Sequence, residues 1–286
     1  MRKQMRTTTA KHHIKSNQLI YNIFGALTTI SFVIPIYFFI INSFKDLKAI
    51  RRQPLLITKE MFTLNSITEA WSATEYPSNF VNSILVLFIS CGCLVIFGSL
   101  ASFAIVRINN QKTRRLYSSI VALMTIPMQV AMIPLAWQLS VFGLIDTRGG
   151  IAVVYLAFGL PFTIFLFTGF MRTIPIELAD SSTIDGCGMF QTYLLIYMPL
   201  MKTVTGTLLI LRGTYIWNDI LVPLLTVRRP SRTTLPMTLI TLSTSRGTRW
   251  DIMFGASLLI SLPIIVIFLV FQKSFISGIV AGAVKG

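Results

Sequence analysis

Few side chains in this chain of 286 residues have the chemistry and spacing of a catalytic or metal-binding set. The histidines are limited to His12 and His13, in a basic N-terminal tail, and the cysteines Cys91, Cys93 and Cys187 form no CxxC pair. The sequence also lacks the GxxxxGKS/T loop that cradles nucleotide phosphates. We therefore expect no catalytic residue, no metal site and no cofactor bound by this chain itself.

One segment, about residues 173–202, combines acidic and small residues in a pattern suited to contact with another protein. Thr173 is a good N-cap residue, and Pro175 suits the first turn of the helix that would follow. Glu177 and Asp180 lie in the first two turns of that helix, where its positive end favours carboxylates. The segment therefore predicts a short helix that is capped by Thr173.

A turn and a second helix are expected after this first helix. Gly186 tolerates positive φ and follows Asp185, a frequent turn residue, and the second helix is predicted from about Met189. The less polar face of the first helix would hold Ile176, Ala179 and Thr183. Such a helix–turn–helix would fit a groove on another protein, but the same capping and amphipathicity describe an ordinary solvated loop.

Membrane-spanning helices are predicted to position these residues. Hydrophobic residues make up 53% of the chain and charged residues 12%, with a mean hydropathy of +0.71, whereas a soluble domain has about twice that charged fraction. Six stretches reach the roughly 20 apolar residues that cross a bilayer as a helix: about 18–44, 79–106, 116–139, 150–171, 193–225 and 253–275. The fifth exceeds one crossing and contains Gly206, Gly213 and Pro223, so we expect it to be tilted, kinked or broken. The predicted fold class is an all-α integral membrane protein with about six transmembrane helices.

The charge pattern indicates how these helices cross the membrane. The chain has 25 Lys and Arg against 10 Asp and Glu, and the basic residues lie where anionic lipid headgroups rather than nucleic acid would meet them. An even number of spans places both termini on one side. The short, basic loop from Arg107 to Arg115 favours a cytoplasmic location for the termini, although the basic residues of the two sides as a whole are nearly balanced.

The predicted spans also define the organisation of the chain. The parts are a basic tail (1–17), a membrane domain that begins with an uncleaved anchor (18–276) and a C-terminal tail (277–286). Two long polar segments are expected on the side opposite to the acidic segment: 45–78 and 227–251. Small residues spaced four apart, as in Gly98-x3-Ser102 and Gly278-x3-Gly282, predict close packing between helices.

The acidic segment resembles the EAA loop of ABC importer permeases. That loop has the pattern E-A-A, then a glycine, then a hydrophobic residue before a proline, and Asp180, Ser181 and Ser182 stand at the E-A-A positions. Gly186 and Pro199 occupy the glycine and proline positions. Asp in place of Glu keeps the charge and Ser in place of Ala keeps the small size, so a docking role is compatible with these departures.

The resemblance extends over nearly the whole chain and is to the carbohydrate, MalG-like branch of this family. It rests on short motifs in the family's order: Asn42-Ser-Phe-Lys45, Asn79-Phe-Val-Asn-Ser83, Ile133-Pro-Leu135, Gly143-Leu-Ile-Asp-Thr147, Trp217-Asn-Asp-Ile-Leu-Val-Pro223 and Gly282-Ala-Val-Lys-Gly286. The resemblance implies a type I ABC importer transmembrane domain in a bacterial plasma membrane, with six spans, cytoplasmic termini and a cytoplasmic EAA loop.

The function implied by this resemblance is that of a permease subunit in an ATP-driven importer for a sugar or oligosaccharide. It would form half of the pathway in a heterodimer with a second permease, and two ATPase subunits would hold ATP and Mg. The residues expected to couple to the ATPase are Glu177, Ala179, Asp180, Ser181, Ser182, Asp185 and Gly186. An extracellular or periplasmic sugar-binding protein would dock on the second polar segment through Arg228, Arg229, Arg232, Arg246 and Arg249, although an exposed basic loop explains these arginines as well.

Residues within the fifth span are candidates to line the pathway. Aromatic faces stack on sugar C–H surfaces, and amide and carboxylate groups bond hydroxyls, which suits Tyr215, Asn218 and Asp219. Structural roles stay open for Asn218 and Asp219, and they are favoured for Trp217 and Arg212. Arg212 lies seven residues before Asp219, roughly 10 Å along a helix, which argues against a direct pair.

Other classes of membrane protein fit the residues less well. An ion-coupled secondary transporter would place buried carboxylates in several helices, whereas only Asp219 is expected to be buried. A channel would show a filter motif or a regular series of arginines, and an enzyme would show a clustered nucleophile or acid pair. An ABC permease for another small solute remains an alternative, and the particular sugar is not encoded in any motif of the chain.

Overall fold

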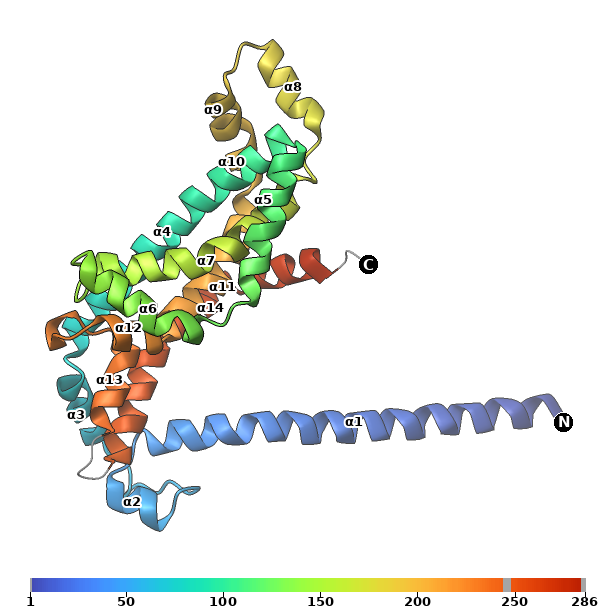
Figure 1. Cartoon of the computed structure of the whole chain (residues 1–286). Coiled ribbons are helices and arrows are strands. Elements are labelled where there is room, and N and C mark those ends of the chain that lie inside the picture. The colour runs from blue at the N-terminus through green and yellow to red at the C-terminus, as the bar shows by residue number, and fades with distance from the viewer. Residues whose placement is uncertain (1, 244–247, 284–286) are drawn as a thin grey trace. The chain divides into compact units, whose positions relative to one another are not determined.

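The computed structural model describes residues 2–243 and 248–283, with side chains for residues 21–243 and 248–269. Every regular element in this described part of the chain is a helix (Figure 1). The chain divides into two units: unit 1 comprises residues 1–71 and 245–259, and unit 2 comprises residues 72–244 and 260–286. The predicted all-α class is therefore confirmed.

Unit 1 is organised around a buried lysine at the end of its first helix. It contains α1 (Arg2–Asn42), α2 (Leu47–Arg52), most of α3 (Asn65–Ala73) and the start of α14 (Trp250–Ala283). The fully buried Lys45 donates from Nζ to Asn42 Oδ1 (3.3 Å) and to the carbonyl oxygens of Gln53 (3.0 Å) and Pro54 (3.3 Å). A buried ammonium group needs such acceptors, and through them Lys45 connects the end of α1 to the segment that follows α2.

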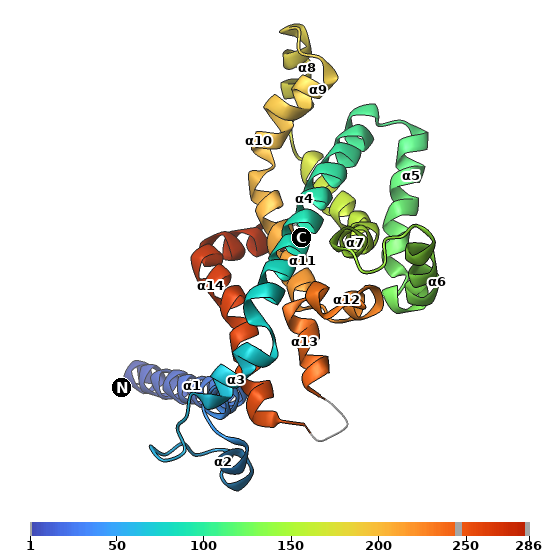
Figure 2. The same ribbon diagram turned by 90° about the vertical axis from the view of Figure 1, so that its left-hand side faces the viewer.

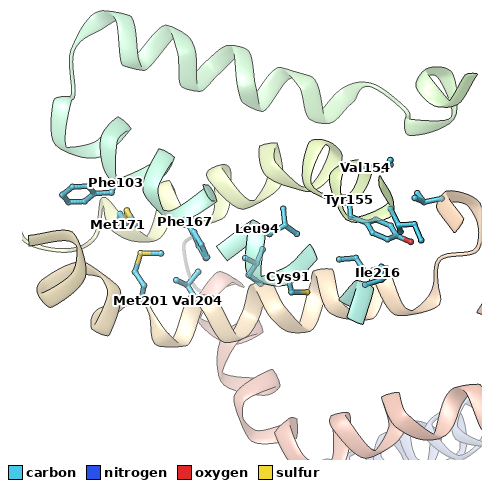
Figure 3. Close-up of a cluster of buried hydrophobic side chains, with 14 of the residues drawn as sticks. Cys91, Leu94, Phe103, Val154, Tyr155, Phe167, Met171, Met201, Val204 and Ile216 are labelled. Carbon is cyan, nitrogen blue, oxygen red and sulfur yellow. The ribbon is translucent and has the colours of Figure 1, made fainter. Parts of the chain in front are cut away.

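Three long helices form the centre of unit 2. These are α4 (Tyr76–Ile108), α7 (Arg148–Met171) and α11 (Lys202–Asn218). Figure 3 shows Leu94 of α4, Phe167 of α7 and Val204 of α11 in the apolar cluster between them. Leu94 and Phe167 are fully buried, which identifies the α4–α7 contact as the core of the unit.

Close packing between α4 and α7 depends on a small residue. A Cβ atom added to Gly98 would lie 2.3 Å from Thr163 Cγ2, and Ser102, one turn later, donates to the carbonyl oxygen of Ile164 (3.2 Å). Thr163 cannot turn away easily because it is β-branched and its hydroxyl donates to the carbonyl oxygen of Gly159 (2.9 Å). The close packing predicted from the Gly98-x3-Ser102 spacing is confirmed, while the side chains around Gly278 and Gly282 lie outside the described residues.

We expect Gly98→Ala to destabilise the protein by about 1–3 kcal/mol, which is the usual penalty for overfilling a packed contact. Gly92 on the same helix has no atom within 4 Å of the position that a Cβ atom would take, so Gly92→Ala is the matched control and should be neutral or stabilising. Thermal unfolding of both variants in detergent would measure the difference. Equal melting temperatures for the two variants would contradict this packing.

Two of the six predicted spans are broken helices. Within the described part of the chain, four helices are long and apolar enough to cross a membrane: Tyr21–Asn42, Tyr76–Ile108, Arg148–Met171 and Trp250–Leu269. The remaining two candidates are Gln111–Thr125 with Met128–Val141, bent by 100°, and Met189–Leu200 with Lys202–Asn218, bent by 72°. The number of spans is six if each bent pair counts as one crossing, in agreement with the predicted number.

The break in the third span was not expected from the apolar pattern. It separates α5 (Gln111–Ala122) and the short η1 (Leu123–Thr125) from α6 (Met128–Val141). Ile126 is extended (ψ 116°), which is the conformation that a following proline favours, and Pro127 then caps α6. A continuous helix over 116–139 was therefore the wrong prediction, because Pro127 ends the first half.

The fifth span is broken as predicted, but it also ends earlier than predicted. It contains α9 (Met189–Thr192), the π-helical η2 (Tyr193–Tyr197), α10 (Met198–Leu200) and then α11. After Asn218 the backbone becomes extended at Asp219, and a separate helix α12 (Leu221–Thr226) follows. The polar residues Asn218 and Asp219 therefore lie at the end of a helix and not inside one.

The segment after α12 is more ordered than a polar loop. It contains η3 (Pro230–Arg232) and α13 (Leu235–Leu242), and Leu235 is fully buried beside Trp217 and Ile260. Asn82 at the start of α4 donates to the carbonyl oxygens of Ser231 (2.9 Å) and Thr233 (3.1 Å). The interpretation of 227–251 as one exposed loop was wrong for α13, whose apolar first turn packs inside unit 2. Figure 2 shows α12 and α13 at one end of this unit and α8 and α9 at the other.

Candidate functional site

The acidic segment forms a helix–turn–helix at one end of unit 2. Its first helix is α8 (Ile176–Ile184), with Glu177 in the first turn, and its second begins with α9 at Met189 as predicted. Thr173 does not cap α8, because its hydroxyl donates to the carbonyl oxygen of Phe170 (2.7 Å) at the end of α7. Pro175 occupies the N-cap position, and it provides no side-chain hydrogen bond.

The turn between the two helices is closed by backbone hydrogen bonds around Gly186. Gly186 has φ of +85°, and its N–H donates to the carbonyl oxygen of Thr183 (3.1 Å). The N–H of Cys187 donates to the carbonyl oxygen of Ser182 (2.9 Å). Together these bonds form the Schellman arrangement that ends a helix with a left-handed residue, so the predicted turn is present at the predicted glycine.

The inner face of α8 differs from the one expected. Ala179 is fully buried, and the buried Ser182 hydroxyl lies 2.9 Å from the hydroxyl of Thr192 on α9. Ile176 and Thr183, which were expected to share this face with Ala179, are exposed. The reason is that α9 packs against the small residues Ala179 and Ser182, which allow the two helices to approach closely.

The outer face of the helix–turn–helix is both acidic and apolar. Glu177, Ser181 and Asp185 are exposed, as is Gly186. Large apolar side chains are exposed beside them: Ile176, Leu178, Ile184, Met189 and Phe190. We call this surface the α8–α9 face. These apolar residues were not among the predicted site residues, although a cluster of exposed apolar side chains is typical of a protein–protein contact.

An ion pair connects α8 to the end of α4. Arg107 Nη1 donates to Asp180 Oδ1 at 2.9 Å, between residues 73 positions apart in the sequence. The Asp180 side chain is 56% exposed, so the pair is open to solvent. This contact places the basic segment after α4 and the acidic helix α8 at the same end of unit 2, as the predicted topology requires.

The carboxylate of Asp219 accepts hydrogen bonds that stabilise the local structure. Tyr155 donates its hydroxyl to Asp219 Oδ2 (2.9 Å), and the N–H groups of Leu221 (3.2 Å) and Val222 (3.0 Å) donate to the same carboxylate at the start of α12. Asn218 is exposed and donates to the carbonyl oxygen of Thr214 on its own helix (2.9 Å). Both residues therefore have structural contacts, which was one of the two roles left open for them.

Trp217 and Tyr215 differ in their surroundings although they lie on the same turn. Trp217 is buried and donates from Nε1 to the carbonyl oxygen of Ile260 (3.1 Å), in agreement with the structural role favoured for it. Tyr215 is exposed and lies edge-on to Tyr155, with 6.5 Å between ring centroids. Of the predicted pathway residues, Tyr215 and Asn218 are exposed, and Asp219 is half-buried.

Tyr215 lines a cavity of about 450 Å³ within unit 2. The walls come from η1, the break before α6, α7 and α11, and they are mostly apolar. Tyr155 and Arg212 also line this cavity, which we call the Arg212 cavity. A structural role was the favoured prediction for Arg212, and its position on the wall of a cavity could not be predicted from the helical pattern.

The arginines of the 227–251 segment divide between the two units. Asp146 accepts a side-chain hydrogen bond from Arg229 Nε and backbone hydrogen bonds from Arg228 (3.2 Å) and Arg229 (3.1 Å) in unit 2. Arg249 pairs with Glu69 (2.9 Å) and Asp251 (2.8 Å) in unit 1. Arg228 is exposed and Arg232 is half-buried, while Arg246 lies outside the described residues.

The pKa of Asp146 provides a test of its contacts. The side-chain and backbone hydrogen bonds from Arg229 lower this pKa from its usual 3.8 to about 2. A depressed carboxylate pKa stabilises the fold at pH values above the unfolded pKa, and this contribution disappears as the pH falls through the folded pKa. We therefore expect the melting temperature of the wild type to exceed that of Asp146→Asn by a constant amount above about pH 5 and by a shrinking amount as the pH falls from about 4 towards 2.

Thermal unfolding of both proteins in detergent across this pH range would measure the effect. Asparagine is the appropriate replacement because Asp146 has φ of +64°, a conformation that asparagine also tolerates. A difference between the two proteins that stays constant down to pH 2 would contradict the role of the charged carboxylate.

Within the described residues, no three His, Cys, Asp or Glu side chains come together as a metal site would require. The cysteines Cys91, Cys93 and Cys187 are free thiols, and Cys91 is buried in the core of unit 2.

Comparison with known proteins identifies relatives along most of the chain. A family described as "Binding-protein-dependent transport system inner membrane component" matches residues 95–281. The melibiose/raffinose/stachyose import permease protein MelC of Bacillus subtilis is 29% identical over 93% of this chain and 96% of its own length. A putative ABC transporter permease of a Caldicellulosiruptor species is 33% identical over 96% of this chain and 99% of its own length.

A solved structure has the same fold. It is a bacterial ABC transporter involved in the import of the acidic polysaccharide alginate, and one of its chains aligns with a TM-score of 0.75 at 18% identity. The alignment covers 90% of this chain and 95% of that chain. At this identity the comparison supports the fold alone.

Proposed function

Because the chain belongs to the family of binding-protein-dependent transport system inner membrane components, we propose that it is the permease subunit of an ABC importer for a sugar or oligosaccharide. It is a transport subunit and not an enzyme. The relatives support the solute class, since they include an import permease for melibiose, raffinose and stachyose and a permease for arabinooligosaccharides, both from Bacillus subtilis.

The observation that carries this proposal is the α8–α9 face. A short helix with exposed acidic and apolar side chains, closed by a backbone-bonded turn, is suited to docking into a groove of an ATPase subunit. The buried Ala179 and Ser182 contribute indirectly, because they hold α8 against α9. Glu177, Ser181 and Asp185 contribute directly from the exposed side.

The coupling step transmits work from the ATPase through α8. Two ATPase subunits bind ATP with Mg, and their closure moves the docked helices. The Arg107–Asp180 pair then passes this movement to the end of α4, and the α9–η2–α10 segment passes it to α11. A stiff connection is required for such a lever, and the closed turn at Gly186 contributes this stiffness.

Exposed side chains on this chain also support contacts with a second permease and with a sugar-binding protein. Large apolar side chains are exposed along α4, including Phe88 and Phe97, and a second permease would cover them in a heterodimer that encloses the pathway. An extracellular or periplasmic sugar-binding protein docks at the end of unit 2 opposite to the α8–α9 face, where Arg228 and Arg232 are candidates for the contact. Arg229 and Arg249 are instead paired with acidic residues of this chain.

We assign the chain to a bacterial plasma membrane with both termini and the α8–α9 face in the cytoplasm. The basic residues at the end of α4 (Arg107, which pairs with Asp180) and at the start of α5 (Lys112, Arg114 and Arg115) support this orientation by the positive-inside rule. In this assignment residues 1–17 are a cytoplasmic tail, 18–276 the transmembrane domain and 277–286 a C-terminal tail.

The proposal is tested by sugar uptake into proteoliposomes that contain the assembled transporter and its binding protein. We expect uptake of a labelled oligosaccharide only when ATP is present on the ATPase side. The control is the same preparation with a hydrolysis-deficient ATPase subunit. Uptake in the absence of any ATPase subunit, or uptake driven by an ion gradient, would indicate a secondary transporter and refute the proposal.

A further inference from the structure

Arg212 is a cation without a visible counter-charge in the middle of unit 2. It lies within α11, the second half of the bent candidate span, and no hydrogen bond or ion pair of its side chain occurs among the described residues. Its Nε atom is buried and lacks a hydrogen-bond partner. The nearest acidic residue in sequence, Asp219, already accepts hydrogen bonds from Tyr155 and from two backbone N–H groups.

The guanidinium group is positioned by aromatic rings. It lies 4.6 Å from the ring centroid of Phe162 and 5.8 Å from that of Tyr215. Tyr155 is the third aromatic ring of this cluster, because it lies edge-on to Tyr215. These rings orient the guanidinium group but supply no hydrogen-bond acceptor for its N–H groups.

The Arg212 cavity has the size and composition of a ligand site. Its volume of about 450 Å³ lies within the range of small-molecule pockets, roughly 300–1,000 Å³. Arg212 is the one charged residue among those that line it. Part of the wall is the break between α5 and α6, and such irregular backbone at membrane depth is found where it is buried in protein or lines a water-filled cavity.

An anionic ligand would satisfy the charge of this half-buried side chain. Ionisable side chains within membrane helices face a cavity or a partner, and Arg212 faces a cavity with its Nε atom buried and without a hydrogen-bond partner. A carboxylate matches the guanidinium fork with two parallel hydrogen bonds. The surrounding aromatic faces suit the C–H surface of a sugar ring.

We propose that the Arg212 cavity receives the carboxylate of an acidic saccharide during transport, so that the solute of this importer contains uronic acid units. Arg212 binds the carboxylate, and Tyr215 stacks against the sugar ring. This inference rests on the proposed function and narrows its solute class. A neutral sugar would leave the guanidinium charge uncompensated.

The test compares acidic and neutral saccharides in the assembled transporter in proteoliposomes, with its binding protein at saturating concentration. The acidic panel contains trisaccharides of galacturonic, mannuronic and guluronic acid, and the neutral panel contains their methyl esters, raffinose and maltotriose. The measured quantity is the maximal ATP-dependent uptake rate, because the half-saturating concentration reports chiefly on the binding protein.

We expect the wild type to take up a member of the acidic panel and not its methyl ester. Arg212→Gln should lower this rate at least tenfold, and Arg212→Lys should lower it less because the charge is retained. Arg172→Gln is the matched control: Arg172 also lies over an aromatic ring, 4.8 Å from the centroid of Tyr117, but it does not line the Arg212 cavity. This control should transport at the wild-type rate.

Three results would overturn the inference. Uptake confined to neutral saccharides would exclude an acidic solute, and an unchanged rate in Arg212→Gln would exclude a role for the guanidinium group. Failure of Arg212→Gln to copurify with the second permease, with Arg172→Gln assembling normally, would show that Arg212 pairs with an acid of that subunit. Absence of ATP-dependent uptake for both panels would instead refute the proposed function and the inference with it.

Discussion

Replacing Gly186 with leucine is expected to lower sugar transport about tenfold while the assembled ATPase subunits continue to hydrolyse ATP. Gly186 has φ of +85°, and an L-residue with a branched side chain in the left-handed region is destabilised by about 1–2 kcal/mol. A penalty of about 1.4 kcal/mol corresponds to a tenfold change in an equilibrium. The helix–turn–helix would then leave its closed geometry, and the ATPase movement would no longer reach the membrane helices.

The matched control is Gly186→Asn at the same position. Asparagine tolerates the left-handed region, and no atom lies within 4 Å of the added Cβ position, so neither variant has a steric clash within this chain. We therefore expect Gly186→Asn to keep most of the transport activity. Measuring uptake and ATP hydrolysis in the same proteoliposomes gives the ratio of the two. Equal ratios for the leucine variant and the wild type would show that this turn does not take part in coupling.

Reversing the charge of either Arg107 or Asp180 is expected to lower transport about fivefold or more, whereas exchanging the two charges should restore it. Asp180→Arg would place two guanidinium groups at the present 2.9 Å contact, and Arg107→Asp would place two carboxylates there. Exposed ion pairs contribute only about 0.2–1 kcal/mol to stability, so the melting temperature should change little. The effect on transport is larger because this pair connects α8 to α4.

The double variant Arg107→Asp with Asp180→Arg distinguishes this connection from general damage. It should recover more than half of the wild-type transport per ATP, since the two charges again attract each other. Uptake and ATP hydrolysis of the four proteins in a double-mutant cycle would measure the coupling. Additive losses in the double variant would show that the two side chains act independently, and the pair would then have no part in coupling.

The Gly186 and Arg107–Asp180 experiments test two different features of the helix–turn–helix. Gly186 controls the shape of the helix–turn–helix, and Asp180 controls its attachment to α4. A loss of coupling in both series would assign the acidic helix to the ATPase contact. The Arg212 cavity is lined by other helices, so its variants should lower the uptake rate without changing the ratio of ATP hydrolysis to transport.

The positions of helices and turns were largely predictable from the sequence. Apolar stretches of about 20 residues identified the spans, because a helix in lipid forms all the hydrogen bonds of its backbone within the segment itself. The turn at Gly186 was predictable because glycine is the residue for which positive φ carries no steric penalty. Small residues at Gly98 and Ser102 likewise predicted close helix packing, and the structure shows that α7 is the partner.

The sequence alone determined the membrane class, the helical segments and the acidic turn, because these depend on composition and on neighbours within a few residues. Tertiary structure decided that Asp180 pairs with Arg107, that Asp219 accepts a hydrogen bond from Tyr155, and that Arg212 faces a cavity. The physical reason is that such contacts join residues far apart in the chain. Whether a charged side chain finds a partner, or is left to bind a solute, depends on which helices pack together and not on the local pattern.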